Sequence, residues 1–326
     1  MCKRQSKFTI AATLLASLMA IGPVASHADD GVVNSTNNAQ QVALLHWYPA
    51  GSAAQFPVGS RPTALAFDGE HMWVVNSFSN TVTEVRASDG AIVATILVAT
   101  SPSGIAFDGA SIWVTSFGSN QVLKVQASDG KILGTFLTGS GPQAVAFDGA
   151  NIWIANGFSN NVTKLRASDG AHLGVFPAGS NPLAVAFDGA DIWVANHGSD
   201  NLTKLRASDG ATLGTFAVGK APTGLAFDGK NMWVTNESGN TVTKLRASDG
   251  AIQGAFSAGT NPNGVAFDGA NLWVANNLGP GTVTKLRASD GTSLGTFPSG
   301  SFPFGVAFDG AHIWVANGAS NTVSKL

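Results

Sequence analysis

The sequence has very little cysteine, little charge and only one long apolar run, and each scarcity excludes a class of protein. Its single cysteine is Cys2, and charged residues make up only 12% of the chain. A formal net charge of -2 gives no support to nucleic-acid binding, which depends on releasing counterions from phosphates. A hydrophobic fraction of 44% excludes a disordered chain, and 39 glycines exclude a helical bundle.

The one long apolar run lies near the start and is typical of an export signal. Lys3, Arg4 and Lys7 precede a run that ends near residue 21, and Ser26-His27-Ala28 supplies small residues for cleavage. We therefore expect residues 1–28 to be a signal peptide and the protein to be periplasmic or extracellular. An uncleaved N-terminal anchor is the alternative. Cys2 precedes the run, so it does not fit a lipoprotein signal.

Cleavage after Ala28 would change both the cysteine content and the charge. No cysteine would remain for a disulfide, a catalytic thiolate or a thiolate-bound metal. The remaining chain would hold 15 basic and 20 acidic residues, because the leader carries three basic residues and no acidic one. We expect residues 29–51 to be a lead-in segment, flexible at its start.

The rest of the chain is one unit repeated seven times. Phe-Asp-Gly recurs at intervals of 40 or 41 residues, and a tryptophan follows six residues after each Phe. The tripeptides begin at Phe67, Phe107, Phe147, Phe187, Phe227, Phe267 and Phe308. The tryptophans are Trp73, Trp113, Trp153, Trp193, Trp233, Trp273 and Trp314. A period this regular indicates a repeat architecture.

Each unit contains four short strand signals separated by turn residues. In the third copy these are residues 144–147, 151–155, 162–166 and 173–176, with Asp-Gly pairs at two of the turns. Four strands at this period predict an all-β fold, a seven-bladed β-propeller with four antiparallel strands per blade over residues 52–326. The last copy stops before its fourth strand, and residues 55–62 resemble residues 175–182. We therefore expect an N-terminal strand to complete the last blade and close the ring.

The repeat resembles a known family. Trp193-Val194-Ala195-Asn196, followed by Asn201-Leu202-Thr203-Lys204-Leu205, is similar to the YVTN-type β-propeller repeat of secreted and surface bacterial proteins. A more distant likeness is to the virginiamycin B lyase-like propellers. The first resemblance implies a fold and leaves the role open, because most of that family has no assigned role.

Most charges fall at repeated positions. Thirteen of the 20 acidic residues are the aspartates of the Phe-Asp-Gly and Ser-Asp-Gly turns, and eleven of the 15 remaining basic residues occupy two positions on the third strand. We expect the aspartates to cap turns through backbone N–H groups, and the Lys and Arg stems to cover apolar surface near the rim. A polyanion-binding belt is the alternative.

Few charged residues remain outside the repeat, which is a small inventory for acid–base chemistry. They are Asp29, Asp30, Arg61, Glu70, Glu84, Lys131, Asp191, Asp200, Lys220, Lys230 and Glu237.

Candidate binding residues lie in the loops that vary between copies. In a propeller, the loops between the second and third strands emerge on the same face as the loops between blades, and variable loops on a rigid frame often bind ligands. Five phenylalanines on neighbouring blades could form an apolar shelf there: Phe78, Phe117, Phe158, Phe302 and Phe304. The alternative is that each ring packs on its own blade.

The same face carries a second, polar candidate site. Blades four and five carry His197, Asp200, Lys220 and Glu237, which could form a metal site, an acid–base pair or a surface ion pair. The resemblance to virginiamycin B lyase implies a metal centre rich in histidine and glutamate. Because this face has only one histidine, we carry over no metal ligand and no catalytic residue.

Six of the seven second strands end in asparagine, and this ring of amides has two readings. The residues are Asn76, Asn156, Asn196, Asn236, Asn276 and Asn317. They could coordinate a ligand, but six equivalent copies favour bonding to their own loop backbone.

The sequence therefore predicts a monomeric, non-enzymatic binding or interaction module without a cofactor. Its partner would be a protein, a peptide or a carbohydrate, not a nucleic acid, and no segment after the leader is apolar for long enough to cross a membrane. Two alternatives stay open. One is a metal-dependent lyase or lactonase-like hydrolase with its site at the channel mouth, and the other is a structural component of the cell envelope or surface.

Overall fold

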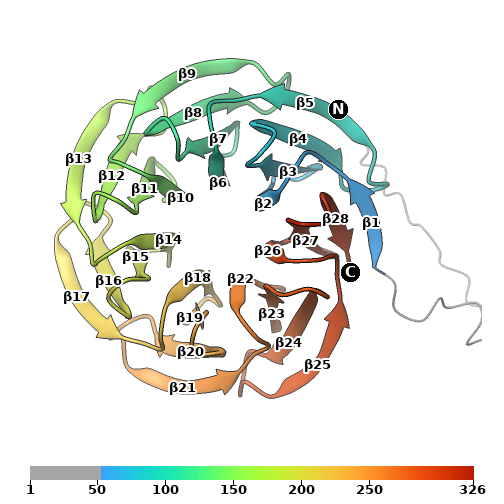
Figure 1. Cartoon of the computed structure of the whole chain (residues 1–326). Helices are drawn as coiled ribbons and strands as arrows, with labels where there is room; N and C mark the ends of the chain where they lie inside the picture. Colours follow the sequence, from blue (N-terminus) through green and yellow to red (C-terminus); the bar gives the residue numbers. More distant parts are fainter. Residues whose placement is uncertain (1–52) are drawn as a thin grey trace, which may run out of the picture. The chain divides into compact units, whose positions relative to one another are not determined.

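The computed structural model describes residues 53–326, in which every regular element is a β-strand. The strands form seven sheets of four antiparallel strands each, arranged radially around a central axis (Figure 1). The predicted seven-bladed β-propeller is confirmed. The predicted signal peptide and lead-in segment lie outside the described residues.

The strands of blades one to four run from the ring's centre to its rim in chain order. Blade one holds β2 (Pro62–Phe67), β3 (His71–Asn76), β4 (Thr81–Arg86) and β5 (Ile92–Leu97). Blade two holds β6 (Pro102–Phe107), β7 (Ser111–Ser116), β8 (Gln121–Gln126) and β9 (Ile132–Leu137). Blade three holds β10 (Pro142–Phe147), β11 (Asn151–Asn156), β12 (Asn161–Arg166) and β13 (His172–Pro177). Blade four holds β14 (Pro182–Phe187), β15 (Asp191–Asn196), β16 (Asn201–Arg206) and β17 (Thr212–Ala217).

Blades five and six repeat this order, and blade seven departs from it. Blade five holds β18 (Pro222–Phe227), β19 (Asn231–Asn236), β20 (Thr241–Arg246) and β21 (Ile252–Ser257). Blade six holds β22 (Pro262–Phe267), β23 (Asn271–Asn276), β24 (Thr282–Arg287) and β25 (Ser293–Pro298). Blade seven holds β26 (Pro303–Phe308), β27 (Ile313–Asn317), β28 (Thr322–Lys325) and β1 (Ala54–Pro57).

Blade seven combines strands from far apart in the sequence. β1 pairs antiparallel with β28, and Phe56 lies opposite Val323. This is the pairing that the comparison of residues 55–62 with residues 175–182 predicts. The Phe56 ring also stacks on Trp314 of the same blade, with ring centroids 5.7 Å apart.

The apolar core lies between neighbouring sheets. The second strand of a blade is covered on both faces, as β11 is, whereas the outermost strand alternates between exposed and half-buried residues. Each cluster joins two blades; for example, Trp113 and Val122 of blade two pack with Ile152 and Leu165 of blade three. A near-continuous apolar run thus marks a buried second strand, and an alternating pattern marks a strand at the rim.

An aromatic contact recurs at the blade junctions. Phe176 on β13 lies 5.5 Å from Trp153 of its own blade, measured between ring centroids. Its ring also covers Gly210 in the Ser-Asp-Gly turn of the next blade, where a Cβ would overlap it. Blade one differs because Ile96 stands at the phenylalanine position and covers Gly130 of blade two. The junction between blades one and two therefore lacks an aromatic ring that the other junctions have.

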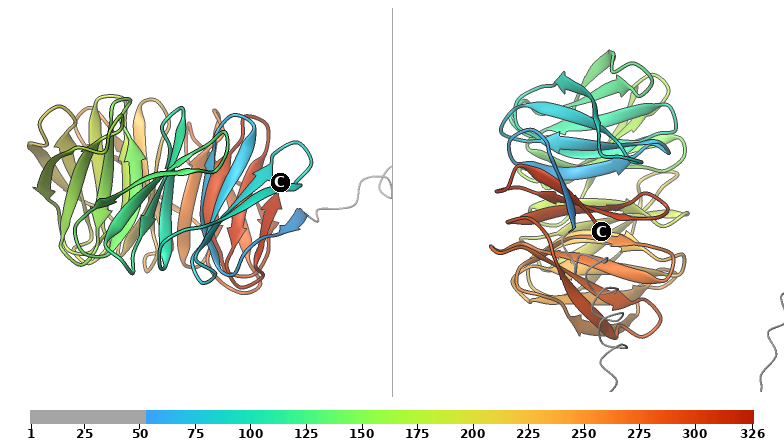
Figure 2. Two further views of the ribbon diagram at one scale, coloured as in Figure 1. Left: turned by 90° about the horizontal axis from the view of Figure 1, so that it is seen from above. Right: turned by 90° about the vertical axis from the view of Figure 1, so that its right-hand side faces the viewer.

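The connections gather on two faces of the ring (Figure 2). On one face, which we call the loop face, the loop after a second strand bonds to the loop that enters the same blade. Phe78 N donates to Ser60 O at 3.1 Å and Ser77 N donates to Arg61 O at 2.9 Å. The other face carries the Asp-Gly turns, and we call it the turn face. Residues 53–326 include no helix that could span a membrane.

Candidate functional site

Three of the five predicted phenylalanines meet at one pocket on the loop face, between blades seven and one. The pocket has a volume of about 380 Å³. Phe78 and Phe302 are 66% and 42% exposed, which leaves large apolar surfaces in contact with solvent. The lining consists of Ser60, Arg61, Phe78, Phe302, Phe304, Gly318, Ala319 and Asn321. We call this the loop-face pocket.

Arg61 is the only charged residue that lines this pocket. Its guanidinium carbon lies 4.6 Å from the ring centroid of Phe78 and 5.5 Å from that of Phe304. No carboxylate among residues 53–326 forms an ion pair with it. The guanidinium therefore stacks on aromatic faces and keeps its charge available to an anion.

The backbone at Arg61 and Phe302 is strained. Both residues have φ of 53°, in the left-handed region that large side chains rarely adopt. The equivalent positions in other blades hold smaller residues such as Ser101, Asn181 and Ala221. The two largest side chains at this repeated position thus both line the loop-face pocket, and such strain is typical of functional sites.

The other two predicted phenylalanines form a separate pair. Phe117 and Phe158 lie edge to face with ring centroids 5.0 Å apart, and Phe158 is 68% exposed. Neither lines the loop-face pocket. The five rings therefore form two groups on neighbouring blades.

The structure brings together only part of the predicted polar site. His197 Nε2 lies 3.3 Å from Glu237 Oε2, in a half-exposed pair that links blades four and five. Asp200 Oδ1 instead accepts a hydrogen bond of 2.8 Å from the N–H of Ala221. Asp200 thus has the same structural role as the asparagine at this position in other blades. For example, the Asn160 side chain accepts a hydrogen bond from Asn181 N. Treating Asp200 as a residue outside the repeat was wrong.

The polar site also has no third metal ligand. Within residues 53–326 there is no group of three His, Cys, Asp or Glu placed to hold a metal ion. Lys220 forms no ion pair with any of these described residues.

The ring of asparagines is buried, and the expected backbone bonding is wrong in detail. Asn156 Nδ2 donates to Asn161 Oδ1 and Thr163 Oγ1, both at 2.9 Å on the neighbouring strand. The carbonyl oxygen of Asn196 accepts from Gly179 N, at 3.0 Å. All six amides are buried and are not exposed to a ligand at the mouth. Their Nδ2 groups join neighbouring strands, and only Asn196 and Asn276 also bond to a loop through Oδ1.

On the turn face, the Phe-Asp-Gly aspartates cap their turns as predicted. Asp148 Oδ1 accepts from the N–H groups of Ala150 and Asn151 at 2.9 and 2.6 Å. Its Oδ2 also accepts from Trp153 Nε1 at 2.7 Å, a bond that every blade repeats. Burial alone would raise the pKa of Asp148, but these hydrogen bonds hold it below its ordinary value.

The repeated arginine and lysine positions have different roles. Arg166 is exposed and pairs with Asp169 of its own turn at 3.0 Å. Lys164 is only 5% exposed, and its Nζ lies 4.8 Å from the Trp153 ring centroid. That ammonium donates to the carbonyl oxygens of Ala207 and Ser208 in the next blade, at 2.7 and 3.1 Å. The expectation that the lysines cover the rim was wrong, because they join adjacent blades.

The same lysine bridge recurs at four further junctions. The Nζ atoms donate to the equivalent alanine carbonyl at 2.6 to 2.8 Å. The lysines that do so are Lys124, Lys204, Lys244 and Lys325.

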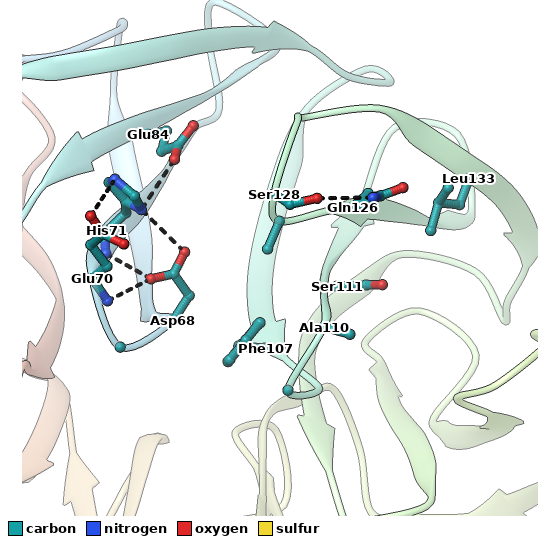
Figure 3. A pocket seen from close by; sticks show the side chains of 13 residues that line it. Asp68, Glu70, His71, Glu84, Phe107, Ala110, Ser111, Gln126, Ser128 and Leu133 are labelled. Carbon is teal, nitrogen blue, oxygen red and sulfur yellow. Dashed lines mark hydrogen bonds and ion pairs between the residues drawn. The ribbon is translucent and has the colours of Figure 1, made fainter.

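Blade one carries a carboxylate where every other blade carries this lysine. Glu84 pairs with Trp73 across the strands, in the register that places Lys164 opposite Trp153. It faces a groove of about 880 Å³ between blades one and two (Figure 3). We call this the acidic groove. Its lining is Asp68, Gly69, Glu70, His71, Glu84, Phe107, Gly109, Ala110, Ser111, Gln126, Ala127, Ser128 and Leu133.

Glu84 is held in a negative environment. Its side chain is 9% exposed, and its Oε1 lies 3.2 Å from His71 Nδ1. His71 Nδ1 also lies 3.6 Å from Asp68 Oδ2, and its Nε2 lies 4.0 Å from Glu70 Oε1. Burial raises the pKa of Glu84, and the nearby Asp68 and Glu70 carboxylates raise it further, against the attraction of His71.

Glu84 is one of the charged residues outside the repeat, and the sequence alone predicts no role for it. The available signal was its place in the repeat, since it stands where Lys124, Lys164 and their equivalents stand. A charge of opposite sign at a position otherwise occupied by lysine marks the acidic groove. The predicted binding residues all lie on the loop face and therefore do not include Glu84.

Comparison with solved structures supports the fold. The chain is similar to a streptogramin B lyase structure, at 19% identity and a TM-score of 0.72, with 84% of this chain and 96% of that one covered. It is also similar to the hydrazine synthase of Kuenenia stuttgartiensis, at 19% identity and a TM-score of 0.71, with 86% and 98% covered. At this identity the likeness is one of fold, and it agrees with the resemblance to virginiamycin B lyase-like propellers. No protein-family model and no curated protein sequence matches the chain.

Proposed function

We propose that this protein is an exported, non-enzymatic binding module whose ligand occupies the loop-face pocket. The observation that carries the proposal is the stacked Arg61 guanidinium, which lies over Phe78 and Phe304 without a carboxylate partner among residues 53–326. A ligand that suits this pocket presents an apolar or aromatic group beside an anionic one, as the C-terminus of a peptide does. The aromatic faces bury the apolar group, and Arg61 pairs with the carboxylate.

The proposed export is supported by the charged start, apolar run and small residues of residues 1–28. The phenylalanine pair of blades two and three, Phe117 and Phe158, extends the proposed contact surface for a larger partner. The alternative of a metal-dependent lyase or hydrolase would have to rest on His197 and Glu237, because Asp200 bonds to the backbone.

Binding of N-acetyl-phenylalanine and of its uncharged amide tests the proposal. Calorimetry should show that the wild-type protein binds the acid more tightly than the amide. R61Q should remove that preference, a loss of about tenfold in affinity for the acid. The matched control is R166Q, which alters an exposed arginine on the turn face and should change nothing. Equal binding of the acid by wild type and R61Q, or no binding by wild type, would overturn the proposal.

A second variant pair separates the two aromatic groups. Phe78→Ala with Phe302→Ala should abolish binding of the small probe while leaving the melting temperature nearly unchanged, because both rings are exposed. Phe117→Ala with Phe158→Ala should leave probe binding intact and reduce capture of a larger partner only.

A further inference from the structure

At other blade junctions, the region equivalent to the acidic groove contains the ammonium group of a lysine side chain. At five junctions a lysine Nζ bonds to the carbonyl oxygen of the alanine that follows the third strand of the next blade. At the junction of blades one and two the equivalent carbonyls belong to Ala127 and Ser128, which line the groove. Among residues 53–326, no lysine donates to them.

The side chain at the lysine position is shorter and of opposite charge. The Glu84 side chain ends one bond earlier than a lysine side chain would, and an ionised carboxylate has no proton to donate to a carbonyl. Its one ion-pair partner in the described chain is His71, which contacts Oε1. The other carboxylate oxygen receives no hydrogen bond from residues 53–326. A carboxylate whose side chain is about nine-tenths buried therefore faces the same groove as two carbonyl oxygens.

The rest of the groove also favours a cation with an apolar body. Asp68 and Glu70 add two more carboxylates on the blade-one side (Figure 3). On the blade-two side Gln126 replaces the arginine of other blades, and it bonds to Ser128 Oγ at 2.9 Å. Apolar wall is supplied by Phe107, Ala110 and Leu133.

We propose that the acidic groove binds a ligand through a primary ammonium group on an alkyl chain, the chemistry of a lysine side chain. The ammonium would donate to the carbonyl oxygens of Ala127 and Ser128, and Glu84 would balance its charge. The alkyl chain would lie against Phe107 and Leu133. This site is on the turn face and is separate from the loop-face pocket.

Titration of the full chain with pentylammonium at pH 8 tests the proposal. Calorimetry should show saturable binding of pentylammonium and none of 1-pentanol, which has nearly the same shape without the charge. E84Q should weaken binding by about tenfold or more. K230Q is the matched control, because Lys230 stands at the position of Glu70 in the groove between blades five and six. It should leave binding unchanged.

E84K is the sharpest variant, because it supplies the protein's own ammonium. We expect it to abolish pentylammonium binding and to raise the melting temperature, as the new lysine joins blades one and two. Three results would overturn the proposal: no binding by wild type, equal binding of 1-pentanol, or unchanged affinity in E84K. A stabilising response to Ca²⁺ without any response to pentylammonium would also overturn it, in favour of a metal ion.

Discussion

The grooves between blades one and two and between blades five and six are built from the same repeat positions but have opposite charge. The first has a volume of about 880 Å³ and contains Asp68, Glu70, Glu84 and His71. The second has a volume of about 700 Å³, and its charged lining is Asp228, Lys230, Lys244 and Arg287. Both grooves contain an aspartate that caps a turn, but only the second contains the lysine bridge. The difference shows that substitutions at a few repeat positions can reverse the charge of one blade junction without altering the strand arrangement.

Reversing the charge in the second groove should have the largest effect. K244E would remove the bridge to Ala288 and place a buried carboxylate beside the Asp228 carboxylate, which costs about 3–5 kcal/mol. Urea unfolding followed by tryptophan fluorescence measures this loss.

A companion variant tests the role of His71. Asn231 stands at the His71 position, so K244E combined with N231H should recover part of the stability at pH 5, where the new histidine is protonated. If K244E is as stable as wild type, the bridge contributes nothing and the comparison of the grooves fails.

Removing the capping aspartate should also distinguish the grooves. D228A would leave the Trp233 Nε1 and two backbone N–H groups without their acceptor, a loss of about 3 kcal/mol. D68A removes the equivalent bonds, but it also relieves the repulsion between Asp68 and Glu84, so we expect its cost to be smaller than that of D228A. Equal losses in the two variants, measured by urea unfolding, would mean that Asp68 and Glu84 do not interact.

The stability of E84Q should depend on pH in a predictable direction. Burial raises the pKa of Glu84 above its usual 4.5, so the folded protein disfavours the carboxylate. Above the raised pKa, E84Q should therefore be more stable than wild type. As the pH falls through the raised pKa, Glu84 protonates and the advantage should disappear. Melting temperatures at pH 8 and pH 4 measure the difference; an advantage that grows in acid would contradict this reasoning.

The smallest effect should come from the loop face, outside both grooves. H197A would break a half-exposed pair with Glu237, which should change the free energy of unfolding by less than about 1 kcal/mol. It should leave pentylammonium binding unchanged. A loss of several kcal/mol, or a change in metal-induced thermal shift, would instead support the enzymatic alternative at His197 and Glu237.

Much of the frame was predictable because each blade repeats the same turn chemistry. The seven Phe-Asp-Gly tripeptides gave the blade count, and the match between residues 55–62 and residues 175–182 gave the partner of β28. The role of Lys164 was not predictable in the same way. A lysine on an alternating strand can point to solvent or between sheets, and only the packing of the next blade supplies the carbonyls that it bonds.

The candidate sites were harder to predict, because a residue that differs from its equivalents in other blades can have either the same structural role or a new one. Asp200 looked unusual by its charge but serves as asparagine does elsewhere. Glu84 is also unusual by its charge, but the informative fact is that it stands at a repeat position that holds lysine in every other blade. The pairing of Arg61 with the rings of Phe78 and Phe304 depends on how loops of blades seven and one meet, which periodicity does not specify.

Because of the aromatic contact across blade junctions, the two Asp-Gly turns of a blade differ in whether their glycine can be replaced. Gly149 and Gly170 both follow an aspartate and both have positive φ. A side chain at Gly149 would meet no atom within 4 Å, whereas one at Gly170 would overlap the Phe136 ring. Asparagine, among the side-chain-bearing residues that best tolerate positive φ, should therefore cost only backbone strain in the first turn, whereas in the second it would also overlap the phenylalanine ring. The residues that each of these turns can accept thus depend on the neighbouring blade as much as on the turn itself.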